Sequence, residues 1–267
     1  LKDRIESQIL THYPKSVETA LQITEQEAGI NEVQKEKVVV SDLIKRLIEQ
    51  VAFEARESEF VDKKSGVSAR LTIAAYENAV SAAERRAIIN NEAKTHVWMS
   101  DLTGIIPSIT GKIELVYEGE QEGPYQVSFN LLEKSIRSQF RLYFPDPETL
   151  KKRRPKGKEA ENPYKAIIAW FDSGNALNLF LETKDEDKIQ LLYKVSGLHA
   201  LVKKQYNALN EKDTALLMEF VLHGLAAHSL ISKKVIDGKI EFKDLMGSML
   251  NMGSGHFNEE DLTEEDF

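Results

Sequence analysis

Apolar residues recur at helical spacing through much of the chain. Between residues 41 and 56 they fall three and four positions apart, and Ser41 precedes them as an N-cap with Asp42 in the first turn. A second stretch, 69–90, carries an alanine-rich apolar face, which permits close packing against another helix. The pattern predicts one long helix over each stretch, with a polar break between them.

Shorter and less regular elements follow the second helix. The segment KTHVWM at 94–99 predicts a short strand. The apolar positions within 100–109 predict a further helix, and Pro107 limits how regular that helix can be. Residues 118–124, with the sequence EGEQEGP, are expected to form a turn or loop.

The N-terminal part shows weaker patterns. Residues 1–13 carry an apolar stripe that is too short to stand alone, and Pro14 ends it. A short helix is expected over about 18–27. Gly29 and Asn31 then predict a charged loop.

The C-terminal part is expected to be helical as well. A helix is predicted over 128–144, followed by a surface linker over 146–162, more helices from 163 to 250 and an acidic, disordered tail over 251–267. The helices expected after the linker are Tyr164–Leu181, Asp187–Asn207, Glu211–Ser232 and Phe242–Leu250.

Composition supports a mostly α protein. Hydrophobic residues make up 42% of the 267 positions and charged residues 29%, which is typical of a soluble globular chain. With 14 Gly and 7 Pro there are few helix breakers. The absence of Cys excludes a disulfide scaffold, Cys-bound zinc, iron–sulfur clusters and thiol catalysis.

The net charge limits the kinds of partner that the chain is expected to bind. A net charge of -8 makes the chain a poor candidate for broad nucleic-acid binding. The basic run over 151–158 is interpreted as a solvated loop because no aromatic residues interleave with it, and a phosphate contact is the alternative.

No apolar run approaches the roughly 18 residues of a membrane span, and the N-terminus has neither a signal peptide nor a Met. We therefore expect a fragment of a longer protein without a membrane segment.

No motif predicts a self-contained active site or a metal site. Gly104 and Gly111 are separated by six residues where a phosphate loop has four, and Ile113 stands where Ser or Thr must hold magnesium. His223 and His228 are five apart, which is not the spacing that places two ligands on one helix face. They are expected to be core or interfacial histidines.

Two arginines are the candidate functional residues. Arg4 lies in LKDRI between Leu1 and Ile5, and Arg70 opens a predicted helix in SGVSAR. A guanidinium at a helix start faces the positive end of the helix dipole, so a bound anion would compensate for its position. Exposure to solvent or pairing with a carboxylate is the alternative interpretation.

The order and spacing of these motifs resemble the small helical lid of AAA+ ATPases. The stretch KSGVSARLTIAAYENAVSAAERRAIIN, followed by VWMSDL and GKIELVYEGE, is similar to the lid of the magnesium-chelatase and MoxR-like group. That group includes bacterial proteins called magnesium chelatase or sigma-54-interacting regulators. LKDRI resembles the L-x-D-R-F end of the AAA+ core, and MEFVLHGLAAHSLISK resembles the C-terminal region of the same proteins. The resemblance covers most of the chain and is weak over 145–165.

The resemblance implies roles for both arginines. Arg70 would be the sensor-2 arginine that contacts the γ-phosphate of the nucleotide, either of its own subunit or of a neighbour. Arg4 would be the arginine finger that reaches in trans into the neighbouring subunit's site. The phosphate loop and the acidic magnesium-binding strand lie upstream of LKDRI in such proteins and are absent here. ATP and Mg²⁺ are therefore expected only in the full-length protein, and the fragment alone is not expected to hydrolyse ATP.

The expected organisation follows the same resemblance. Its parts are the end of the AAA+ core (1–13), the lid with its short strand (14–120), a C-terminal helical domain (121–250) and the acidic tail (251–267). The parent would be a cytoplasmic, ring-forming homo-oligomer that remodels a protein partner or assists metal insertion.

Two alternatives are open. In a non-enzymatic helical protein-interaction module, Arg4 and Arg70 would have no function. A sigma-54-type transcription activator would need a DNA-binding helix at the C-terminus. The acidic tail and the lack of an obvious basic recognition helix argue against that activator.

Overall fold

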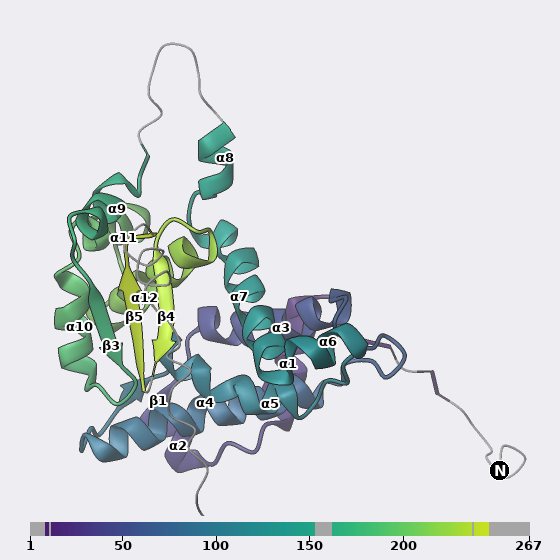
Figure 1. Ribbon diagram of the computed structural model, residues 1–267. Coiled ribbons are helices and arrows are strands. Elements are labelled where there is room, and N and C mark those ends of the chain that lie inside the picture. Colours follow the sequence, from purple (N-terminus) through teal and green to yellow (C-terminus); the bar gives the residue numbers. More distant parts are fainter. Residues whose placement is uncertain (1–8, 11, 153–161, 237, 246–267) are drawn as a thin grey trace, which may run out of the picture. The chain divides into compact units, whose positions relative to one another are not determined.

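The computed structural model is mostly α-helical, as the sequence predicts (Figure 1). It describes residues 9–10, 12–152, 162–236 and 238–245. Contacts divide the chain into two compact units, which are described separately. The first comprises 1–145 and 181–186, and the second comprises 146–180 and 187–267.

The first unit consists of helices and one short pair of strands. Its elements are α1 (Val17–Glu27), α2 (Glu32–Lys37), β1 (Val38–Val39), α3 (Asp42–Glu57), α4 (Arg70–Ile89), β2 (Thr95–His96), the 3-10 helix η2 (Met99–Ile105), α5 (Ile106–Thr110), α6 (Tyr117–Glu122) and α7 (Pro124–Tyr143). The predicted helices over 41–56 and 69–90 correspond to α3 and α4. The helix expected near 18–27 corresponds to α1.

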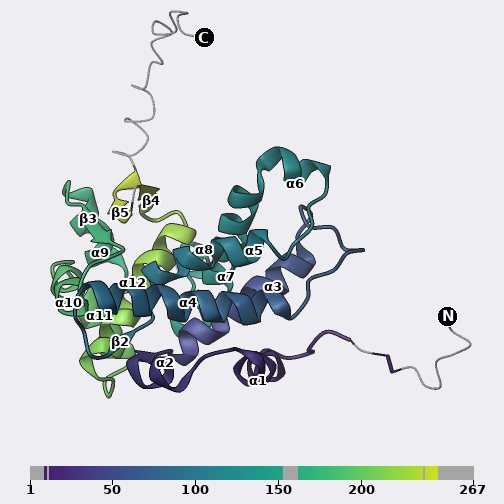
Figure 2. The ribbon, with the colours of Figure 1, turned by 90° about the horizontal axis from the view of Figure 1, so that it is seen from below.

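Helix α3 packs against α1, α4 and α7 (Figure 2). Ser41 caps it, because its Oγ accepts a hydrogen bond from the backbone N–H of Ile44 at 3.3 Å. Its apolar positions recur three and four apart, so they form one buried face. The fully buried apolar residues of α3 are Ile44, Leu47, Val51, Ala52 and Ala55.

Helix α4 uses alanine to approach its neighbours closely. It packs against α1, α3, α5 and η2. The fully buried residues of its apolar face are Leu71, Ala75, Ala79, Ala83 and Ala87. Just before the helix, Ser68 Oγ accepts a hydrogen bond from the backbone N–H of Arg70 at 3.2 Å.

The short strand expected at 94–99 is confirmed. β2 pairs in parallel with β1, with Val38 opposite Thr95. The helix expected over 100–109 is divided into η2 and α5. Pro107 lies in the first turn of α5, where its missing N–H breaks no helical hydrogen bond.

Two segments of the first unit that were expected to be loops are helical. After Gly29, Asn31 caps α2: its Oδ1 accepts from the N–H of Gln34 at 2.9 Å, and Gln34 Oε1 accepts from the N–H of Asn31 at 3.2 Å. This is a capping box, so Asn31 starts a helix instead of continuing a loop. Most of the loop expected over 118–124 forms α6.

Helix α7 belongs to the first unit, so the division of the chain lies at Pro145 and not near residue 120 as expected. The helix begins at Pro124, four residues before its predicted start. It packs on α3, where Ser138 Oγ donates a hydrogen bond to Glu54 Oε1 at 2.6 Å. Its buried apolar residues are Val127, Leu131, Leu132, Ile136 and Phe140.

The second unit combines helices with a small sheet. Its elements are α8 (Pro147–Lys152), α9 (Lys165–Asp172), β3 (Leu177–Phe180), α10 (Asp185–Tyr193), α11 (Leu198–Gln205), α12 (Glu211–Ala227), β4 (Ser232–Ile236) and β5 (Lys239–Lys243); the first two residues of α10 count with the first unit. Every residue of α12 from Thr214 to Leu225 is buried. A helix that is buried on all sides forms the core of its unit.

The sheet of the second unit was not predicted. The strands are antiparallel in the order β3-β5-β4, and Phe242 lies in β5 opposite Leu177. The helix expected over 164–181 is confirmed only over α9, because residues 177–180 form β3. The helix expected from 242 is wrong at residues 242–243, which belong to β5. The signal for strands is the Asp-Gly dipeptide at 237–238 between two β-rich runs, which is typical of a hairpin.

One expected helix of the second unit is divided in two. The single helix predicted over 187–207 forms α10 and α11, and Gly197 lies before the second of them with a φ of 78°. A Cβ at this position would lie 2.6 Å from the Cβ of Ala166. Gly197 is therefore required both by its left-handed backbone and by the close approach of the chain.

Some predictions lie outside the described residues. These are the arginine-finger candidate Arg4, most of the segment 1–13, the part of the basic run beyond residue 152 and the acidic tail 251–267. Ile9 and Leu10 are described, and they are exposed in chain without helical structure. Within the described part of the chain, no helix has the length and apolar character needed to cross a membrane.

Candidate functional site

Arg70 is the first residue of α4, and its side chain is exposed. The first turn of the helix contains no acidic residue. Among the described residues, the guanidinium of Arg70 makes no hydrogen bond or ion pair, although its backbone N–H is bonded to Ser68. Of the alternatives left open by the sequence, pairing with a carboxylate is thus not observed.

The backbone that leads into α4 is held by side chains from other elements. Val67 is buried, and its N–H donates a hydrogen bond to Tyr13 Oη at 2.9 Å. Its carbonyl accepts a longer hydrogen bond from Arg56 Nη2 at 3.4 Å. Both backbone polar groups of this residue are therefore paired, three positions before Arg70. The side chain of Arg70 is exposed, while the backbone three residues before it is held by these two hydrogen bonds.

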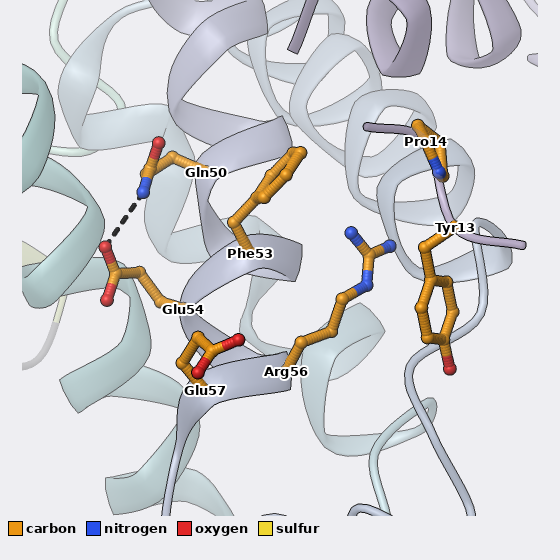
Figure 3. Close-up of a pocket in the computed structure, with 7 residues that line it drawn as sticks. All are labelled: Tyr13, Pro14, Gln50, Phe53, Glu54, Arg56 and Glu57. Atoms are coloured by element: carbon orange, nitrogen blue, oxygen red, sulfur yellow. Dashed lines mark hydrogen bonds between the residues drawn. The ribbon is translucent and has the colours of Figure 1, made fainter. Parts of the chain in front are cut away.

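A pocket of about 290 Å³ lies beside Arg56 (Figure 3). The lining residues are Tyr13, Pro14, Gln50, Phe53, Glu54, Arg56 and Glu57. The Cζ atom of Arg56 is 4.3 Å from the ring centroid of Tyr13 and 5.2 Å from that of Phe53. The guanidinium therefore lies close to two aromatic rings, which attract it through their π-electron faces.

Only some of the hydrogen-bond donors of Arg56 have partners among the described residues. Its Nε is buried without a hydrogen-bond partner among the described residues. Burial lowers the pKa of Arg56, and its interactions with Tyr13 and Glu49 oppose that change.

The pocket also contains acidic groups. Gln50 Nε2 donates a hydrogen bond to Glu54 Oε1 at 2.9 Å, and Glu57 is exposed at the rim. Because a cation and two carboxyl groups line the same space, the pocket is not specific for an anion. We assign no ligand to it.

A second arginine of α4, Arg86, is buried and fully engaged. Nη1 donates a hydrogen bond to Asp185 Oδ1 at 2.6 Å. Nη2 and Nε reach the two carboxylate oxygens of Asp101 at 3.1 Å and 3.2 Å. Nη2 also donates to Thr95 Oγ1 at 3.1 Å and to the carbonyl of His96 at 2.9 Å. Arg86 has no role as a ligand-binding group, because its donors are directed at the protein itself.

Asp185 connects this cluster to the segment 181–186, which belongs to the first unit. Its Oδ1 accepts from Trp98 Nε1 at 2.7 Å and from Thr95 Oγ1 at 3.0 Å. Burial by itself lowers the pKa of Arg86, but the charges and hydrogen bonds of Asp101 and Asp185 outweigh it, so the pKa is raised. The sequence contained no signal for this cluster, because Asp185 is 99 residues from Arg86.

The second unit has its own buried polar group. His223 Nδ1 lies 3.2 Å from Lys233 Nζ, and its ring packs edge-on against Phe242 at 5.2 Å. Burial, followed by the charges of Lys233 and Lys188, lowers the pKa of His223 well below its ordinary value. A neutral imidazole can accept a hydrogen bond from the ammonium group.

The histidines at 223 and 228 are both buried, 3% and 5% exposed, which confirms the expectation of core residues. Nearby, Lys188 and Glu219 are fully buried, and their Nζ and Oε1 atoms are 3.9 Å apart. In the described ranges, no three or more His, Cys, Asp or Glu side chains are grouped to hold a metal ion.

Comparison with known proteins found no matching family model, no matching curated protein and no matching solved structure. The resemblance to AAA+ lids therefore depends on the order of the sequence motifs. Of the two arginines that this resemblance singles out, Arg70 is located at the start of α4, and Arg4 is among the residues not described.

Proposed function

We propose that this chain acts as the C-terminal part of a AAA+ ATPase of the magnesium-chelatase and MoxR-like group. In this proposal, identical subunits form a cytoplasmic ring, and hydrolysis of ATP with Mg²⁺ remodels a protein partner or assists metal insertion. This chain contributes Arg70 to the nucleotide phosphates and Arg4 to the site of a neighbouring subunit.

The observation that carries the proposal is the exposed guanidinium of Arg70 at the start of a 20-residue helix, where no described residue pairs with it. The backbone N–H groups and dipole at a helix N-terminus favour an anion, and the planar guanidinium matches phosphate oxygens with two parallel hydrogen bonds. The helix dipole slightly disfavours a cation at this position, and a bound anion would compensate for that effect. A nucleotide phosphate would supply that anion.

The fixed backbone before α4 supports the same role. Side chains that contact phosphate must be held in place to select one geometry. Val67, three residues before Arg70, has both backbone groups bonded to Tyr13 and Arg56. The backbone that leads to Arg70 is therefore held in place.

The first experiment determines the coding sequence before Leu1. A G-x-x-x-x-G-K-[ST] motif followed by an acidic-ended apolar strand supports the proposal. ATP turnover is then measured for the protein that includes this sequence. Since a hydrogen bond to a charged group is worth about 1.5–3 kcal/mol, Arg70→Ala should lower turnover by roughly 10- to 150-fold.

The matched control is Arg85→Ala, which removes an exposed arginine from the other end of the same helix. It should retain wild-type turnover. A start codon directly before Leu1, or equal turnover in Arg70→Ala and Arg85→Ala, would contradict the proposal. The non-enzymatic interaction module would then be the better assignment.

A further inference from the structure

A buried carboxyl group links three helices of the first unit. Glu49 of α3 is 2% exposed, as are Thr24 of α1 and Thr72 of α4. Glu49 Oε1 lies 2.6 Å from Thr24 Oγ1, and Thr24 Oγ1 lies 2.8 Å from Thr72 Oγ1. Thr72 Oγ1 in turn lies 3.1 Å from the carbonyl oxygen of Ala69, the residue before α4 begins.

These three oxygen–oxygen contacts have hydrogen-bond distances, so each needs one hydrogen. The carbonyl of Ala69 can only accept, and the two threonine hydroxyls supply one hydrogen each. An ionised Glu49 supplies none, which leaves one of the three contacts without a hydrogen. A protonated Glu49 completes the set: it donates to Thr24, Thr24 donates to Thr72, and Thr72 donates to the carbonyl of Ala69.

The surrounding charges do not compensate for an ionised Glu49. Among the described residues, Arg56 is the charged group that acts on Glu49, and its Nη2 donates a hydrogen bond to the carbonyl oxygen of Val67 instead of to Glu49. Burial raises the pKa of Glu49, and the opposing effects of Thr24, Thr72 and Arg56 are smaller.

Four further charged side chains on the helices around Glu49 have partners elsewhere, while Arg70 of α4 is exposed to solvent. These pairs are Lys45 with Glu25, Arg46 with Glu18, Glu77 with the N–H of Gly29, and Glu54 with Ser138. Tyr76 of α4 is influenced by Lys45, Glu25 and Lys35 and not by Glu49. A buried carboxylate without a paired cation is strongly disfavoured, so the neutral acid is the better state for this site.

We propose that Glu49 is a neutral carboxylic acid in the folded protein at neutral pH, and that its proton completes a hydrogen-bond chain from α3 through α1 to the first turn of α4. Loss of the proton removes one link, which makes the connection between the three helices sensitive to pH. This chain of hydrogen bonds ends at Ala69, one residue before Arg70, but the inference does not depend on the function proposed for Arg70.

Infrared spectroscopy of the whole chain tests the protonation state directly. Ordinary carboxyl groups are ionised at neutral pH, so the folded wild-type protein should show the C=O stretching band of one protonated acid. Glu49→Gln should remove the band. The control is Glu54→Gln. Glu54 lies on the same helix and its carboxyl group also accepts a hydrogen bond from a hydroxyl, so this variant should retain the band. Absence of the band in the folded wild-type protein would overturn the proposal.

Unfolding experiments provide a second test. Glutamine keeps an N–H donor toward Thr24 at every pH, so Glu49→Gln preserves the chain without a titrating proton. In the wild type, the folded state keeps a proton that the unfolded state loses above its ordinary pKa of about 4.3, so stability falls as pH rises. Between about pH 5 and 7 the unfolding constant of the wild type, relative to that of Glu49→Gln, should rise about tenfold per pH unit.

A constant ratio over this range would contradict the inference. If Glu49→Gln does not fold, Thr24→Val serves in the infrared experiment, because it removes the acceptor of the Glu49 hydroxyl without adding a charge. The acid band should then shift from its wild-type position. An unshifted band would mean that the protonated group is not Glu49.

Discussion

Arg70 and Arg86 lie on the same helix and have opposite surroundings. Arg86 is 1% exposed and is bonded to Asp101 and Asp185, while Arg70 is exposed and its guanidinium has no partner in the described structure. The helix dipole by itself favours a cation in the last turn, where Arg86 lies, over the start, where Arg70 lies. The difference teaches that an arginine becomes structural when tertiary contacts bring acids to it, and stays available for a ligand when they do not.

The largest effect is expected where the buried arginine is removed. Arg86→Met leaves Asp101 and Asp185 buried without their counter-charge. The free energy of unfolding should therefore fall by about 3–5 kcal/mol. Urea unfolding can be followed by the fluorescence of Trp98, which bonds to Asp185, in a Trp170→Phe background.

The neighbouring residue provides the control. Arg85 pairs with Glu182 at 2.7 Å, but both side chains are more than half exposed. Water screens such a pair, so Arg85→Met should cost at most about 1 kcal/mol. Equal losses for Arg85→Met and Arg86→Met would mean that the buried cluster does not stabilise the first unit.

An intermediate effect is expected for a buried base that lies beside cations. The buried charge of Arg86 is stabilised by the acids around it. His223 instead lies against the cation of Lys233, so a second positive charge on its ring is disfavoured and the ring stays neutral. Burial first, and then the charges of Lys233 and Lys188, lower the pKa of His223 in the folded state, so the unfolded state binds more protons below its ordinary pKa of about 6.5.

Stability should accordingly fall as pH decreases through that range, by up to about 1.4 kcal/mol per pH unit from this group. The measurement is the free energy of unfolding from about pH 7.5 to 5.5 for the wild type and for His223→Asn. The stability of the wild type relative to that of the variant should fall as pH decreases, because the opposite contribution of Glu49 is the same in both proteins. Parallel curves would indicate that His223 is not the residue responsible.

The smallest effect on stability is expected at Arg70. Because its side chain is exposed and pairs with no residue that the structure describes, Arg70→Ala should change the free energy of unfolding by no more than about 0.5 kcal/mol. Thermal or urea unfolding of the same preparation used for ATP turnover measures this. A loss above about 1 kcal/mol would show that Arg70 has a structural partner and would weaken its proposed role in nucleotide contact.

Regular amphipathic helices were predicted well. α3 and α4 match the expected ranges within one residue at each end, because a long apolar stripe and an N-cap such as Ser41 are local signals. The short strand β2 was also expected. Asn31 was missed as an N-cap because it follows Gly29, which suggested a loop.

The second unit was predicted less well. Its strands are four or five residues long, and apolar runs of that length do not distinguish a strand from a buried helix. In β5 only Ile240 and Phe242 are buried, which is the alternation of a half-buried strand. The alternation becomes meaningful once the pairing with β3 and β4 is known.

The sequence by itself determined the mostly helical character, the two long helices and the position of Arg70 at a helix start. These depend on spacing and capping within a few residues. Only the tertiary structure decided which arginine is buried, because Asp185 reaches Arg86 across 99 positions. It also brought Glu49, Thr24 and Thr72 together from three helices. Burial and charge pairing depend on groups far apart in the chain, so the state of an ionisable side chain follows from its packed surroundings.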